Sequence, residues 1–173
     1  IKEVLPRISR VAVLHMANNS GFEPILQATQ SAARSMKIGL QQIAVRGPEQ
    51  FESAFSAMTK QRIEAVIINQ EGPLELEVNA KAIAALAAKN RIPSAGSVDF
   101  GNAGGLVGYG VNALDRWRRT ALFVDKILKG ANPAELPMEQ PTKFEMAVNL
   151  KTAKALGVKI PQSILLQATN LIE

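Results

Sequence analysis

Short runs of β-branched and apolar residues alternate with segments of helical periodicity along the first hundred residues of the chain. Four runs have the length and composition of buried strands, namely Arg10–Met16, 40–45, 65–69 and 92–95. Strands and helices that alternate with tight turns form parallel sheets covered on both faces. The sequence therefore predicts an α/β fold with a doubly wound parallel sheet of flavodoxin or Rossmann type.

Local signals predict where the helices between these strands begin. Ser20 and Glu23 have the spacing of a capping box, which predicts a helix start at this point. Pro48 and Pro73 each stand where a first helical residue is expected. The helices after these prolines carry apolar residues three and four positions apart, as amphipathic helices do.

The pattern changes after Ser97. Residues 98–105 are expected to form a glycine-containing loop and residues 106–110 a fifth strand. Asn112 is expected to cap a long helix that ends near Lys129, and a proline-containing linker follows over residues 131–137. The C-terminal residues 143–173 predict a strand over 143–148 and two short helices. One helix is expected to be capped by Asn149 and the other to begin at Pro161.

The composition excludes several kinds of catalytic and metal site. The chain has no cysteine, which removes disulfides, thiolate zinc ligands and cysteine nucleophiles. Its one histidine, His15, lies inside the first strand and is expected to be packed there. Ser20 lacks the flanking glycines of a nucleophile elbow. We therefore expect no metal, no cofactor and no enzymatic activity.

The net charge of +5 raises the question of a nucleic-acid partner. The basic residues are scattered, and the densest group, Arg116, Arg118 and Arg119, lies on an expected helix face beside Asp115. We interpret this group as a solvated face and expect no nucleic acid.

Polar and aromatic residues follow the expected strands at their carboxyl ends, where open α/β sheets bind ligands. The candidate ligand-binding residues are Asn18, Asn19, Ser20, Gln70, Glu71, Ser97, Asp99, Phe100, Asn102, Tyr109 and Asn112. The set suits hydrogen bonding to a small polar ligand beneath an aromatic lid. Any single member can instead be a helix cap or a turn residue.

Roles within this set follow from position. Residues 18–20, with the helix that begins after them, are suited to a carboxylate. Asp99 or Glu71 is suited to an ammonium group, and Phe100 or Tyr109 to stacking on an apolar or aromatic group.

Residues 108–113 (GYGVNA) also match the G-x-G-x-x-A form of a dinucleotide fingerprint. The stretch about 20 residues further on is the proline-containing linker and offers no strand with an acidic end. A tight strand-to-helix turn is the favoured interpretation, and a small nucleotide-binding domain remains an alternative.

Several segments together resemble the substrate-binding proteins of ABC transporters. The segments are AGGLVGYG at 103–110, VDKILKGANPAELP at 124–137, EQPTKFE at 139–145 and VNLKTAKALG at 148–157. Their order and spacing match the periplasmic solute-binding proteins of the type I two-lobe fold, in a group with tryptophan and aromatic amino acid binders. The resemblance covers nearly the whole chain.

The resemblance implies a periplasmic-binding-protein-like lobe, the C-terminal one of a receptor about twice this length. Residues 1–105 would be the second lobe, 106–140 a crossover strand and helix belonging with the first lobe, and 141–173 the return strand and last helices. The receptor would take a small polar ligand, an amino acid among the candidates, and deliver it to a membrane permease. Its location would be periplasmic, or extracellular and membrane-anchored.

Two further possibilities remain open. The same architecture serves as the effector-sensing domain of LacI-like transcription regulators. A lobe that lacks its partner also exposes apolar surface, so a homodimer of this chain is possible.

Overall fold

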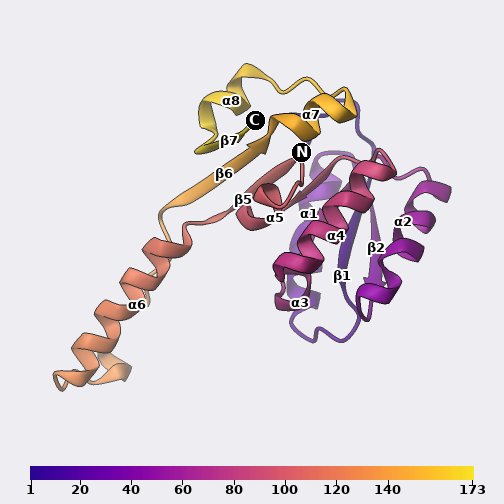
Figure 1. Ribbon diagram of the computed structural model, residues 1–173. Helices are drawn as coiled ribbons and strands as arrows, with labels where there is room; N and C mark the ends of the chain where they lie inside the picture. The colour runs from indigo at the N-terminus through magenta and orange to yellow at the C-terminus, as the bar shows by residue number, and fades with distance from the viewer.

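The computed structural model describes residues 1–173 and contains one sheet of seven strands in the order β2-β1-β3-β4-β5-β6-β7 (Figure 1). The first five strands are β1 (Arg10–Met16), β2 (Gly39–Val45), β3 (Ala65–Ile68), β4 (Ser94–Gly96) and β5 (Val107–Val111). They are mutually parallel, as predicted. β6 (Phe144–Asn149) runs antiparallel to β5, and β7 (Asn170–Ile172) is parallel to β6. The sheet is therefore mixed: the predicted parallel arrangement holds for β1–β5, and β6 adds an antiparallel pairing that the sequence did not predict.

Apart from α5, the helices occupy the expected parts of the chain. They are α1 (Phe22–Ser35), α2 (Phe51–Lys60), α3 (Gly72–Glu75), α4 (Glu77–Lys89), α5 (Val98–Asn102), α6 (Ala113–Leu128), α7 (Leu150–Leu156) and α8 (Gln162–Gln167), with 3-10 turns η1 (Pro48–Gln50) and η2 (Pro133–Glu135). None of these helices combines the length and apolar character needed to cross a bilayer.

Helices cover both faces of the sheet. On one face Leu14 packs with Phe55 and Met58 of α2 and Ile83 of α4 in the largest apolar cluster. The other face is covered by α1 and residues 1–8 over the first strands, and by α7 and α8 over β5 and β6. Each buried side chain of this size stabilises the fold by about 1.5–3 kcal/mol. His15 is buried among these residues and stacks on Phe22 with ring centroids 3.9 Å apart, which confirms its expected packed position.

The glycine-containing stretch after Ser97 is a helix and not the expected loop. The Ser97 hydroxyl accepts a hydrogen bond from the Phe100 backbone N–H at 3.2 Å and caps α5. One helical turn then directs Phe100 into the core, where its side chain is 2% exposed. The expectation that Phe100 stacks on a ligand is therefore not supported.

Two glycines allow α5 to lie directly on β5. A Cβ atom on Gly108 would stand 2.5 Å from the Ser97 carbonyl oxygen, and one on Gly101 would stand 2.9 Å from the Gly108 nitrogen. Both contacts are with backbone, which cannot move aside cheaply. Gly108 and Gly110 lie inside β5 rather than in a turn after it, so the resemblance to a dinucleotide fingerprint reflects packing and gives no support to nucleotide binding.

The long helix α6 projects from the body on a stalk formed by β5 and β6 (Figure 1). None of its sixteen residues is buried. Asn112 caps it as predicted, since its Oδ1 accepts from the Asp115 N–H at 2.6 Å. The Asp115 carboxylate then accepts from Lys143 Nζ at 2.7 Å and Arg119 Nε at 3.2 Å, and the first of these bonds is the main reason that its pKa is lowered. Charged contacts thus join the base of α6 to the returning chain.

The two glycines of β5 give a matched test of this packing. We expect Gly108→Ala to lower the free energy of unfolding by about 1–3 kcal/mol, because the new methyl group meets backbone. Gly110→Ala places its Cβ no closer than 3.8 Å to any neighbour and is expected to change stability by less than about 1 kcal/mol. Urea denaturation followed by circular dichroism measures both, and equal midpoints for the two variants would contradict the proposed contact.

Candidate functional site

The parallel arrangement brings the carboxyl ends of β1, β3, β4 and β5 to one edge of the sheet, where the loops after β1 and β3 meet. The Glu71 carboxylate accepts a hydrogen bond from the Met16 backbone N–H at 2.6 Å and another from the Asn19 side-chain amide. Asn19 Oδ1 in turn accepts from the Gly21 N–H at 2.9 Å. Glu71 therefore positions the loop between β1 and α1, a role that differs from the expected ionic contact with a ligand ammonium group.

Asn18 and Ser20 lie in the same loop and are exposed. Ser20 does not cap α1, because the chain makes a turn through Asn19 and the N-cap residue is Gly21, which has no side chain. The predicted capping box is therefore wrong. Its failure leaves the Ser20 hydroxyl free of a capping bond at the start of a 14-residue helix.

The end of β3 is joined to β5 by a second long-range contact. Gln70 Nε2 donates to the Tyr109 carbonyl oxygen at 2.8 Å. The Tyr109 ring is 50% exposed and stacks on Phe144 of β6, with centroids 5.7 Å apart and planes within 5°. Phe144 was not among the predicted site residues. Its antiparallel pairing opposite Val111 places it beside Tyr109, and sequence patterning alone gives no signal for that pairing.

Asn69 is a second residue that sequence reasoning missed. It is 8% exposed, and its Nδ2 atom has no hydrogen-bond partner. It lines a cavity of about 530 Å³ together with Ile67, Gln70, Ala95 and Tyr109. A buried donor without an acceptor costs about 1–3 kcal/mol, so an unpaired amide at this edge suits contact with a ligand. One feature of the sequence could have identified Asn69 as a site residue: it is the polar residue that ends the apolar run 65–69.

The remaining predicted residues divide into two groups. Ser97 and Asn112 cap α5 and α6, and Asn112 also donates to the Glu145 carboxylate. Asp99 and Asn102 lie apart from the Asn69 cavity and line a separate cavity of about 340 Å³ with Glu75 and Lys81. The structure thus places Asn19, Glu71, Gln70 and Tyr109 at one edge of the sheet, where Asn19 bonds to Glu71 and Gln70 bonds to the Tyr109 backbone. The α5 residues Asp99 and Asn102 lie beside this edge.

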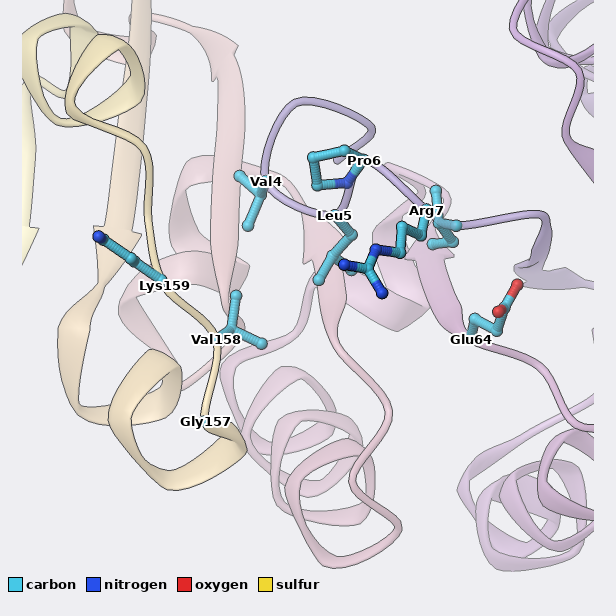
Figure 2. A pocket seen from close by; sticks show the side chains of 9 residues that line it. Val4, Leu5, Pro6, Arg7, Glu64, Gly157, Val158 and Lys159 are labelled. Carbon is cyan, nitrogen blue, oxygen red and sulfur yellow. The ribbon is translucent and has the colours of Figure 1, made fainter.

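A cavity of about 590 Å³ lies at the opposite end of the sheet, between residues 4–8 and residues 157–159 (Figure 2). Glu64 stands at its border and accepts from the backbone N–H groups of Ser9 and Arg10 and from the Ser9 hydroxyl, which lowers its pKa. Arg7 and Lys159 lie on different sides of the cavity in Figure 2 and do not converge on a common point. This end therefore offers no comparable set of ligand groups.

The strand order, with five parallel strands followed by the antiparallel β6, and the helices on both faces of the sheet form a periplasmic-binding-protein-like α/β fold. The chain belongs to the ABC transporter substrate binding protein family, whose model matches residues 1–172. That family consists of transport binding proteins and not of enzymes. No curated protein matches the chain significantly.

Solved structures support the same fold at low sequence identity. A conserved domain protein from Vibrio cholerae has a TM-score of 0.88 and 19% identity, over 98% of this chain and 57% of its own. An ABC domain from Streptococcus pneumoniae, solved in complex with L-Trp, has a TM-score of 0.89 and 21% identity, over 99% and 58%. A ligand-free, open substrate binding protein with adhesive properties from Clostridium difficile has a TM-score of 0.74 and 16% identity, over 99% and 57%. The chain thus spans less than two thirds of the length of these proteins.

The contact between the two loops can be tested by removing the Glu71 carboxylate. We expect Glu71→Ala to lower the free energy of unfolding by about 2 kcal/mol, because the Met16 N–H and the Asn19 amide lose a charged acceptor. Glu75→Ala, four residues on and without a side-chain hydrogen bond, is expected to have little effect. Chemical denaturation of the two variants side by side gives the comparison, and an unaltered Glu71→Ala protein would contradict the assigned role.

Proposed function

We propose that the chain acts as the solute-binding receptor component of an ABC importer and holds a small polar solute at the carboxyl edge of its sheet. The observation that carries this proposal is the partnerless Nδ2 of Asn69 in a cavity that Tyr109 also lines. Tyr109 in turn stacks on the exposed Phe144 ring. The exposed Asn18 and Ser20 side chains lie at the same edge. Donors and an aromatic surface together suit an amphiphilic molecule of small size.

An amino acid is the class of solute that we favour. A carboxylate suits the loop of Asn18 and Ser20 at the start of α1, because backbone N–H groups at a helix N-terminus attract anions. An apolar or aromatic side chain suits the stacked pair of Tyr109 and Phe144. The Streptococcus pneumoniae protein with a similar fold holds L-Trp, which is consistent with this class.

A two-lobed organisation completes the proposal. Residues 1–105 would form one lobe, residues 106–140 would belong with a second lobe supplied by further chain, and residues 141–173 would return to the first. The stalk of β5 and β6 would then be the connection between lobes. A solute that contacts both lobes favours the closed form by its differential affinity, and the closed form would be the one that a permease recognises.

The place of action follows from this role. A receptor that delivers solute to an importer works outside the cytoplasmic membrane, in the periplasm or anchored to the outer surface of the cell. The proposal includes no catalytic step and no cofactor.

The solute class can be tested on the 173-residue chain by nuclear magnetic resonance, which detects weak binding to one side of a cleft. We expect L-tryptophan and other amino acids to shift the backbone amide signals of residues 18–21 and 69–71 and of Tyr109. A sugar of similar size serves as the control solute. Shifts confined to the cavity between Arg7 and Lys159, or no saturable shift with any amino acid, would contradict the proposal.

Two asparagines with the same 8% exposure separate binding from folding. Asn69→Leu removes an unpaired amide, so we expect unchanged or higher stability together with loss of solute-induced shifts. Asn79→Leu removes an amide that donates to the Pro73 carbonyl oxygen at 2.7 Å and leaves that oxygen unpaired. We expect this variant to lose about 1–3 kcal/mol of stability. Thermal melts and the same titration measure both, and Asn69→Leu protein that still binds would exclude Asn69 from the site.

A further inference from the structure

Three helices of the chain end in the same way at the amino edge of the sheet, where the parallel strands begin. After α1, α2 and α4 the chain enters the left-handed region at Lys37, Arg62 and Arg91, with φ values of 55°, 54° and 55°. The isoleucine after each of them is buried, and its N–H donates to a carbonyl oxygen five residues earlier, as in a Schellman motif. Glycine is the usual residue in this conformation, because a Cβ atom makes it less favourable. Each helix therefore ends on a cation where the backbone favours glycine.

Other helix ends of the chain do carry glycine. α7 ends at Gly157, with a φ of 69°, and Gly130 follows α6 with a φ of 97°. A cation near a helix C-terminus interacts favourably with the helix dipole, but a residue of the last turn provides that charge without a left-handed backbone. Arg34, Lys60 and Lys89 already occupy the last turns of α1, α2 and α4. The helix dipole by itself does not account for cations at the three left-handed positions.

The fold gathers these cations because every helix between parallel strands returns to the edge at which the strands start. Lys37 lies two residues before β2, Arg62 three before β3 and Arg91 three before β4. All three side chains are exposed, and none forms an ion pair. Arg7 and Lys159 lie at the same edge, on either side of the cavity in Figure 2. We call these five residues the basic edge.

Few carboxylates oppose the basic edge. Glu3 and Glu64 are the acidic residues of the segments that form it, and Glu64 already accepts hydrogen bonds from two backbone N–H groups. The carboxyl edge, by contrast, carries Glu71, Glu75 and Asp99. Charges of opposite sign therefore stand at the two ends of the sheet, and the positive end has the larger share of unpaired charge.

The second lobe proposed above would not cover the basic edge. β5 leaves the sheet towards α6 at Val111 and β6 returns at Phe144, so the stalk stands at the carboxyl edge. Cations that are spread along an edge and do not converge on one point suit an extended anionic surface better than a single small anion. For a receptor that works outside the cytoplasmic membrane, anionic phospholipid headgroups provide such a surface.

We propose that the basic edge of Lys37, Arg62, Arg91, Arg7 and Lys159 is an electrostatic docking surface for anionic phospholipid headgroups. The proposal rests on the proposed function for the place of action, whereas the charges themselves do not depend on any solute. Contact of this kind would hold the receptor near its permease and leave the carboxyl edge free to open and close on a second lobe.

The left-handed geometry allows a variant that removes the charge and keeps the fold. We expect Lys37→Gly, Arg62→Gly and Arg91→Gly combined to leave the urea midpoint close to that of the unaltered chain, because glycine is unstrained at positive φ. In sedimentation with phosphatidylglycerol vesicles, the unaltered chain should bind and should be released by about 0.5 M sodium chloride. The triple variant should bind at least about tenfold more weakly, since each cation near an anionic bilayer contributes about fivefold in affinity.

A second triple variant removes the same charge from another surface and serves as the matched control. Arg116→Gln, Arg118→Gln and Lys126→Gln lie on the exposed helix α6 and should change vesicle binding by less than about threefold. Equal weakening by the two triple variants would overturn the proposal, because net charge and not the basic edge would then control binding. Absence of binding to phosphatidylglycerol vesicles, or equal binding to phosphatidylcholine vesicles, would also overturn it. Tighter binding to duplex DNA than to vesicles at equal phosphate concentration would overturn the assignment to lipid.

The solute titration of the proposed function separates the two ideas. The glycine triple variant should show the same solute-induced shifts as the unaltered chain, since its substitutions lie at the opposite edge of the sheet. A chain that binds vesicles but no solute contradicts the proposed function alone, and a chain that binds solute but no vesicles contradicts only the docking surface.

Discussion

Five parallel strands carry apolar side chains on both of their faces, and both faces must therefore be covered for the sheet to exist in water. In β1, Val11 and Val13 point to one side and Ala12 and Leu14 to the other, and none of the four is more than 3% exposed. Helices meet this requirement only if each strand is followed by a crossover. All strands then end at the same edge, so the polar loops gather there as a consequence of packing, before any ligand is considered.

Packing alone does not make that edge a site, because loops of polar residues also form ordinary turns. Two long-range hydrogen bonds distinguish it. Glu71 holds the loop after β1, and Gln70 holds the backbone of β5. These bonds use the side chains of Glu71 and Gln70, which sequence position had suggested for the ligand, whereas the buried Asn69 amide stays unpaired and the Tyr109 ring stays half exposed. Glu71 and Gln70, which hold the loops in place, are thus neighbours in the chain of Asn69, which is a candidate for contact with a solute.

What the sequence predicts well here is set by local interactions. The strands, the Asn112 and Asn149 caps and the packed position of His15 depend on neighbours within a few residues, and these predictions are confirmed. The direction of β6, the burial of Phe100 and the partners of Glu71 depend on contacts across the fold. The Glu71 bond to Met16 joins residues 55 positions apart. Periodicity contains no information on such pairings, and for that reason the sequence indicated a region for the candidate site but not the contacts that each residue makes there.

The helix α6 differs from the other long helices of the chain, which bury an apolar face against the sheet. It has an amphipathic sequence without a buried residue, and the contacts that hold it are charged ones at its base. Exposed ion pairs contribute about 0–1 kcal/mol each to stability. They can position a helix, but they do not offset the unfavourable free energy of exposing five apolar side chains to water. The exposed apolar side chains of α6, which include Leu114, Trp117 and Leu128, therefore need cover. The two-lobed organisation proposed above assigns that cover to the second lobe, so the projection of α6 and the crossover between lobes have one physical explanation.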